Sequence, residues 1–155
     1  MIKLKNVSVG YRHKTLISNI NLSLFPGRKI IFTGTEKCGK TALLKTISGQ
    51  IPPLYGCIVK IQNINLCFIP QDIFPENKIA KIKEVVFQKY DYIIIDEPFS
   101  FLTCSEMKQL KKLFKNFDGG LVISQTTHAP LYIQGFENYP LYEKTASANE
   151  NAVYM

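Results

Sequence analysis

The sequence predicts an α/β fold with a parallel sheet, preceded by a smaller antiparallel β portion. Residues 2–9 and 16–25 alternate apolar and polar side chains, the pattern of strands with one buried face. Residues 28–34, 92–96 and 121–124 are instead short apolar runs, as in parallel strands that are buried on both faces. Segments with helical periodicity separate these runs, and strands that alternate with helices indicate a parallel sheet covered by helices.

Turn signals divide the first half of the chain. The Pro-Gly pair at 26–27 predicts a turn before the first buried strand. The segment 41–49, TALLKTISG, has the pattern of a helix, and Gly49 is the kind of residue that commonly ends one. Two prolines and a glycine then interrupt the chain. Residues 57–69 follow, and they predict two short strands.

Two amphipathic helices are expected in the second half of the chain. Residues 77–90 and 105–117 carry apolar side chains at spacings of three and four, and a Gly-Gly pair at 119–120 ends the second helix. The side chains expected to face inward are Ile79, Ile82, Val85, Val86 and Tyr90 in the first helix, and Met107, Leu110, Leu113, Phe114 and Phe117 in the second.

A single domain is expected, because 155 residues of 46% hydrophobic composition support one core. We place this domain at residues 1–144 and expect residues 145–155, which are small and polar, to form a flexible tail. The four cysteines form no C-x-x-C pair and suit a reducing compartment. The N-terminal segment lacks the apolar core of a signal peptide, and no run reaches the roughly 20 apolar residues of a membrane span. A membrane association is therefore expected to be peripheral, on the cytoplasmic or matrix-like side.

The net charge of +7 is compatible with nucleic-acid binding, an anionic membrane surface or simple solubility. Four lysines share helical spacing in the predicted helix at 105–117 and favour a solvated helix face. They are Lys108, Lys111, Lys112 and Lys115. The other lysines are scattered, so no nucleic-acid partner is expected.

Residues 34–41, GTEKCGKT, match the pattern G-x-x-x-x-G-K-[ST] between a predicted buried strand and a predicted helix. In that setting the backbone N–H groups of the loop and of the helix start can surround phosphate groups. Lys40 is expected to reach the β and γ phosphates, and Thr41 to hold Mg²⁺. The loop glycines are Gly34 and Gly39. The alternative is a chance Gly-Lys-Thr turn, which both flanking elements disfavour.

The segment IIIDEP places two carboxylates at the end of a buried strand, about 55 residues after the glycine loop. Carboxyl ends of parallel strands gather at one edge of the sheet, where ligands bind. Asp96 is expected to bind Mg²⁺ through water, and Glu97 to polarise the attacking water. A solvated strand end is the alternative, and it becomes less favoured because the glycine loop is also present.

The two motifs make the chain resemble the ATP-binding subunit of an ABC transporter, over nearly its whole length. The resemblance implies a P-loop NTPase with a RecA-type core and with ATP and Mg²⁺ as cofactors. Tyr11, in NVSVGYRHKTL, matches the aromatic residue that stacks on adenine in this family, although a tyrosine at an ordinary strand end is the alternative. Gln71, in CFIPQDIFP, matches the glutamine that senses Mg²⁺ and the transporter partner. Asp96 and Glu97 match the family's magnesium aspartate and catalytic base.

The histidine that contacts the γ phosphate in this family has two candidate positions here. His128, in GGLVISQTTHAPL, matches it, but the stretch is one residue longer than the family pattern, so that Gln125 can take the place instead. We favour His128. The same stretch also resembles the ATP-binding subunit of the heme exporter of cytochrome c maturation.

The family's helical subdomain and its signature L-S-G-G-Q have no counterpart in the sequence. Only 25 positions separate Gln71 from Asp96, and the signature would fall on residues 72–76, DIFPE. This segment offers a proline without an N–H group and two carboxylates that would repel a phosphate. The chain therefore has half of the family's composite site, and a second ATPase subunit with an intact signature could supply the other half.

These observations predict an ATP-binding subunit of an ABC-type complex that works with a membrane-spanning transporter subunit. It is expected to bind MgATP and to hydrolyse it weakly, or only with a partner. The alternative is a reduced homologue that does not hydrolyse ATP and uses it as a structural ligand or an assembly switch. A GTPase or a small kinase fits poorly, because the chain lacks an N-K-x-D turn and has only Arg12 and Arg28 as arginines.

Overall fold

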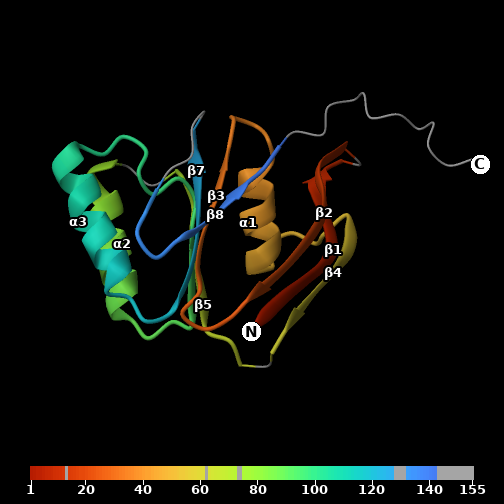
Figure 1. The fold of residues 1–155 in the computed structure, drawn as a ribbon, viewed down its shortest axis with the longest axis horizontal. Helices are drawn as coiled ribbons and strands as arrows, with labels where there is room; N and C mark the ends of the chain where they lie inside the picture. The colour runs from red at the N-terminus through yellow and green to blue at the C-terminus, as the bar shows by residue number, and fades with distance from the viewer. Residues whose placement is uncertain (13, 62, 73–74, 128–131, 143–155) are drawn as a thin grey trace, which may run out of the picture.

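Two β-sheets enclose one helix, and two further helices lie on the outer face of the larger sheet (Figure 1). The computed structural model describes residues 1–12, 14–61, 63–72, 75–127 and 132–142. The tail predicted at 145–155 lies outside the described residues. The single domain predicted at 1–144 also stays a prediction.

The smaller sheet is antiparallel and has the strand order β2-β1-β4. Its strands are β1 (Ile2–Tyr11), β2 (Lys14–Leu24) and β4 (Tyr55–Lys60). The alternating residues in β1 and β2 bury one face against α1, as the sequence pattern predicts. The two short strands predicted at 57–69 exist, but they belong to different sheets, since β4 pairs with β1 and β5 joins the parallel sheet.

The larger sheet is parallel, with the order β5-β6-β7-β3-β8. Its strands are β3 (Lys29–Gly34), β5 (Leu66–Ile69), β6 (Tyr92–Ile95), β7 (Gly120–Thr126) and β8 (Glu137–Pro140). All four residues of β6 are buried, which agrees with their continuous apolar run. The sequence gives no signal for β8, because its side chains, from ENYP, lie mostly exposed at the sheet edge.

The helices are α1 (Lys40–Ser48), α2 (Pro75–Phe87) and α3 (Cys104–Lys115). Gly49 ends α1 in a left-handed conformation, as predicted. The apolar faces of α2 and α3 pack on one face of the parallel sheet, whereas α1 lies between the two sheets (Figure 1). None of the helices among the described residues is long and apolar enough to cross a membrane.

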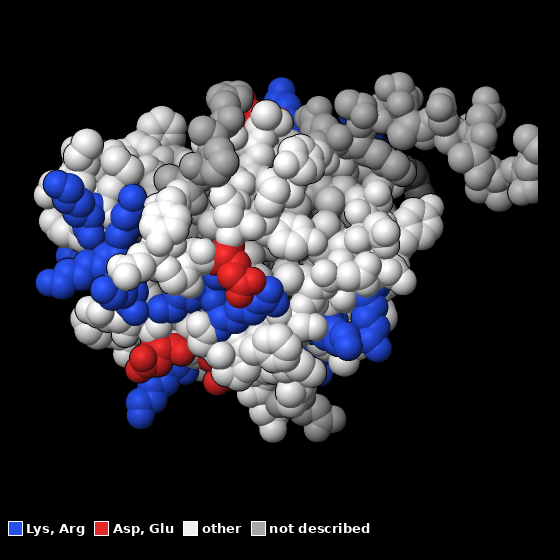
Figure 2. Space-filling model, in the orientation of Figure 1, with Lys and Arg blue, Asp and Glu red and all other residues white. Residues whose placement is uncertain are grey.

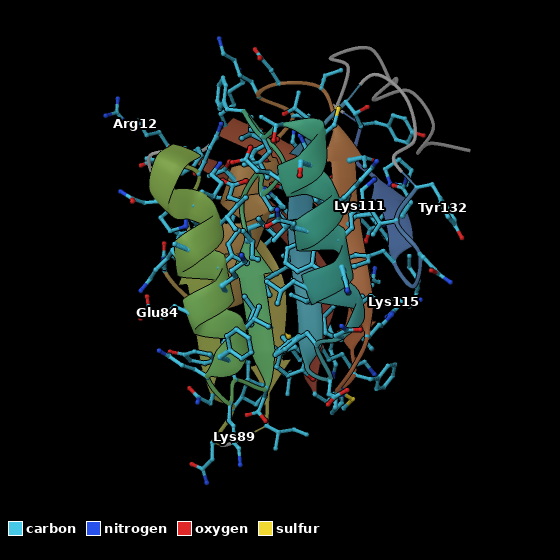
Figure 3. The ribbon with its side chains drawn as sticks, turned by 90° about the vertical axis from the view of Figure 1, so that its left-hand side faces the viewer. Arg12, Glu84, Lys89, Lys111, Lys115 and Tyr132 are labelled. Carbon is cyan, nitrogen blue, oxygen red and sulfur yellow. The ribbon has the colours of Figure 1, made fainter. Side chains whose placement is uncertain are left out.

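The lysine-rich side of α3 faces away from the sheet, as its helical spacing predicts. Figure 3 labels Lys111 and Lys115 on this helix and Glu84 on the neighbouring α2. Figure 2 shows basic side chains gathered on the side of the molecule that α2 and α3 form. The arrangement agrees with a solvated helix face.

A buried hydrogen bond joins the two sheets. The phenol of Tyr92, on β6, donates to the backbone oxygen of Leu24, on β2, at 3.0 Å. Burial also raises the pKa of this phenol. The Tyr92→Phe substitution leaves the Leu24 oxygen without its donor, so we expect it to lower the free energy of unfolding by about 1–2 kcal/mol.

Chemical denaturation of the two proteins measures this difference. Tyr55→Phe is the matched control, because the side chain of Tyr55 is 70% exposed, and its effect should stay within about 0.5 kcal/mol. Equal stabilities of Tyr92→Phe and the wild type would contradict the assignment of this bond.

Candidate functional site

The glycine loop connects the end of β3 to the start of α1. Gly39 precedes α1 with φ of 106°, and no side chain caps this helix end. The first N–H groups of a helix have no acceptor within the helix, so those of α1 are available to a ligand. A Cβ atom on Gly39 would lie only 2.9 Å from Cδ1 of Ile17, which explains why the loop needs glycine there. The loop therefore has the donors and the close backbone approach of a phosphate cradle.

Lys40 is buried at the base of this loop. Its Nζ donates to the backbone oxygens of Gly34 at 3.1 Å and of Thr35 at 2.6 Å. The ammonium group thus closes the loop on itself. An entering phosphate would compete with these two carbonyl oxygens for the same donor group.

Asp96 meets Thr41 across the base of the site. The Oγ1 of Thr41 donates to Oδ2 of Asp96 at 2.7 Å, although the two residues are 55 positions apart. The other carboxylate oxygen, Oδ1, accepts from Oγ of Ser124 at 2.5 Å. The register of β6 and β7 explains this contact, because Ile95 lies opposite Ile123 and the next residues are then side by side.

Glu97 follows Asp96 in a strained backbone conformation, and several neighbouring groups form hydrogen bonds with it. Its φ is 51°, in a region that side chains other than glycine seldom adopt. Its N–H group donates to Oγ of Ser124 at 2.9 Å. Its carboxylate accepts from Thr126 at 2.5 Å on Oε1, and from Ser100 at 3.0 Å and Gln125 at 2.9 Å on Oε2. Both carboxylate oxygens therefore already have donors within the chain.

A cavity of about 490 Å³ lies above the glycine loop. Tyr11 is 46% exposed and lines its wall, as do Gln71 and Glu97. The remaining lining residues come from β2, β7 and the loop with the start of α1: Leu16, Glu36, Lys37, Gly39, Lys40, Thr41, Ala42 and Thr126. The structure thus gathers residues from five separate stretches of sequence around one opening.

Most of the predicted site residues come together at this cavity. Gly34 and Asp96 lie just behind it, because Lys40 and Thr41 bind them directly. His128 lies outside the described residues, so its predicted role stays a prediction. The alternative, Gln125, reaches Oε2 of Glu97 and keeps its own Oε1 buried without a hydrogen-bond partner among the described residues.

Four residues were missed by sequence reasoning: three bind the carboxylates of Asp96 or Glu97, and one binds the backbone oxygen of Glu97. They are Lys78, Ser100, Ser124 and Thr126. The positions of Ser124 and Thr126 could have been inferred from the predicted strand at 121–124, since the ends of adjacent parallel strands meet at one sheet edge. Nothing in the sequence indicates the contact of Lys78, which depends on how α2 packs.

The residues present fit ATP and Mg²⁺. The hydroxyl of Thr41 and the carboxylate of Asp96 are oxygen ligands of the kind that Mg²⁺ takes, and their contact places them on one side of the cradle. No cluster of three or more acidic, histidine or cysteine side chains is found among the described residues. In nucleotide enzymes, one or two protein oxygens commonly hold Mg²⁺ together with phosphate and water.

Comparison with curated proteins finds proteins named as zinc import ATP-binding proteins. The chain is 35% identical over 117 residues to the zinc import ATP-binding protein ZnuC of Buchnera aphidicola, covering 72% of this chain and 49% of that protein. It is 28% identical over 121 residues to ZnuC of Wigglesworthia glossinidia, covering 77% and 52%. The chain therefore spans about half the length of these relatives. No protein-family model matches it.

Comparison with solved structures finds ABC cassettes. A putative ABC transporter ATP-binding protein from Pyrococcus furiosus superposes with a TM-score of 0.68 at 22% identity, covering 88% of this chain and 96% of that one. A dimeric ATP-binding cassette with bound ADP and Pi gives a TM-score of 0.62 at 17% identity, covering 83% and 88%. At these identities the likeness shows a shared fold.

The fold and the glycine loop define a P-loop NTPase. The sequence relatives and the cassette structures narrow this class further. The chain is a shortened ABC-type nucleotide-binding domain, and the resemblance read from its motifs is confirmed. The hint of a heme exporter stays a prediction, since the relatives named above are zinc-import proteins.

Ser124 gives this site a testable property. Its buried hydroxyl accepts a hydrogen bond from the N–H group of Glu97 and donates one to the carboxylate of Asp96. The Ser124→Ala substitution leaves two buried polar groups without this partner, so we expect the free energy of unfolding to fall by about 2–3 kcal/mol. Denaturation by urea measures it. Ser105→Ala, at an exposed position of α3, serves as the control and should change stability by about 0.5 kcal/mol or less.

Proposed function

We propose that the chain is an ATP-binding subunit of an ABC-type transporter-like complex and that it binds MgATP at the cavity above the glycine loop. The observation that carries this proposal is the convergence of Lys40, Thr41 and Asp96. The three side chains come from the two motifs, and hydrogen bonds already connect Thr41 to Asp96. Relatives named as ATP-binding proteins of zinc import support the assignment.

Each residue has a role that its position supports. Tyr11 offers an exposed ring at the cavity wall for stacking on adenine, and Lys40 offers its ammonium group to the phosphates. Thr41 and Gln71 line the cavity and Asp96 binds Thr41 from behind it, so these three residues would hold the Mg²⁺ that neutralises phosphate charge. Lys40 must first leave the carbonyl oxygens of Gly34 and Thr35, so nucleotide binding should reshape the loop.

Hydrolysis by the chain alone should be weak. The sequence contains no L-S-G-G-Q, and residues 72–76 cannot replace it. A partner ATPase subunit with an intact signature would complete the site, and a membrane-spanning subunit would use the resulting motion. In such a complex the chain would sit peripherally, on the cytoplasmic or matrix-like side of the membrane.

One observation favours a second candidate function. Both carboxylate oxygens of Glu97 are taken by protein donors, and a general base must reach the water that it activates. A chain in this arrangement would bind nucleotide as a structural ligand or an assembly switch without turnover. Glu97 is therefore the residue at which the two candidate functions differ.

Binding of a fluorescent ATP analogue with Mg²⁺ tests the first proposal. We expect the wild-type protein to bind it and Lys40→Ala to bind at least about tenfold more weakly, because a charge-assisted contact to phosphate is lost. Lys45→Ala, at the other end of α1 and away from the cavity lining, is the matched control. Equal, weak binding by the wild type and both variants would refute the proposed nucleotide site.

Turnover separates the two candidate functions. If the donors restrain Glu97, Thr126→Val should free Oε1 and raise ATP hydrolysis about three- to tenfold with little change in nucleotide affinity. Thr126→Ser keeps the hydroxyl and should behave like the wild type. Steady-state phosphate release measures both, with Glu97→Gln as the background. Unchanged turnover in Thr126→Val would mean that the missing signature alone limits hydrolysis.

A further inference from the structure

Lys78 is a buried cation that the proposed nucleotide site does not use. It lies in the first turn of α2 and is 2% exposed. Its Nζ donates to the backbone oxygen of Glu97 at 3.1 Å. It comes from α2 and does not line the cavity, and among the described residues no ion pair within 4.0 Å joins it to either carboxylate. Figure 3 shows α2 lying against this side of the sheet, beside α3.

Two effects make this position unfavourable for a lysine. Burial lowers the pKa of Lys78, since the charged form loses its hydration. The first turn of a helix also carries the positive end of the helix dipole, which disfavours a cation. Glu97 and Asp96 act in the opposite sense on the same ammonium group. The position is therefore tolerable for a lysine only because the two carboxylates are near.

The two carboxylates need such a cation. Asp96 is 1% exposed and Glu97 is 4% exposed, and they are adjacent in the chain. Their side-chain hydrogen-bond donors in the described part of the chain are hydroxyl groups and an amide, which are all neutral: Thr41, Ser100, Ser124, Gln125 and Thr126. The other buried lysine, Lys40, donates to backbone oxygens of the loop. Lys78, bound to the carbonyl oxygen of Glu97, is thus the buried ammonium group whose charge the two carboxylates favour.

We propose that Lys78 is a positioning residue and the built-in counter-ion of the Asp96–Glu97 pair. It holds the carbonyl of the strained Glu97 residue and offsets one of the two negative charges. The pair is therefore stable without a divalent cation, and it binds one weakly unless a nucleotide contributes its phosphates. The inference deepens the proposed function, on which it rests for the role of the pair, but its test needs no nucleotide.

Titration with Mn²⁺ alone, followed by calorimetry or by the spectrum of free Mn²⁺, tests the counter-ion. In Lys78→Met the pair loses its cation, so we expect the affinity for Mn²⁺ to rise about tenfold over the wild type. Lys78→Arg keeps the charge and should retain wild-type affinity. Lys83→Met, an equivalent change at an exposed position of α2, should also leave it unchanged. A purely structural role would loosen the site and weaken Mn²⁺ binding instead.

A second pair of variants keeps the test decisive. Lys78→Gln keeps an N–H donor on a side chain one atom shorter and removes the charge, so it should show the same gain even if Lys78→Met does not fold. Adding Asp96→Asn to either variant should abolish the gain. Unchanged or weaker Mn²⁺ binding by a folded Lys78→Gln protein overturns the proposal. Failure of the wild-type protein to bind ATP would instead contradict the proposed nucleotide site. The Mn²⁺ result does not depend on that outcome.

Discussion

The turn at Asp96 and Glu97 is the constraint on which the site depends. Glu97 has a left-handed backbone conformation that disfavours a side chain, so surrounding groups must hold it. Ser124 accepts a hydrogen bond from the N–H group of Glu97, and Lys78 donates one to the carbonyl oxygen of Glu97. Both contacts require that β6 and β7 keep their register and that α2 packs under the turn. The buried strands of the parallel sheet therefore fix the geometry of the carboxylates.

The shortened connection between β5 and β6 changes what surrounds this turn. The chain spans about half the length of its curated relatives, and here α2 joins the two strands. This helix begins a few residues after Gln71 and carries Lys78 to the carbonyl of Glu97. One short helix thus connects the cavity wall to the acidic pair.

The sequence predicts the features that depend on a local residue pattern. It does not predict the features that depend on how separate elements pack. The glycine loop and the buried run before Asp96 identified the cradle, because backbone geometry demands those residue types. The strand β8 was missed, since ENYP has no alternation and pairs only because β3 presents a free edge. The side chains that bind Glu97 were also missed, because their contacts depend on how separate elements pack. Neither Ser124 nor Lys78 belongs to a recognisable sequence motif. The strand register and the position of α2 bring each of them to Glu97.

In the proposed function, the hydrogen bonds of Glu97 would make nucleotide binding and hydrolysis separable steps. Each bond to a charged carboxylate contributes about 1.5–3 kcal/mol, so releasing both oxygens from three donors requires several kcal/mol. Nucleotide binding with a micromolar dissociation constant supplies about 8 kcal/mol, which is enough for this change if the contacts differ between the two states. Two of the donors, Gln125 and Thr126, lie on the strand that runs beside the glycine loop. In the proposed function, a ligand that shifts this strand end would release Glu97 as the base, and a ligand that only fills the cradle would leave its carboxylate bound.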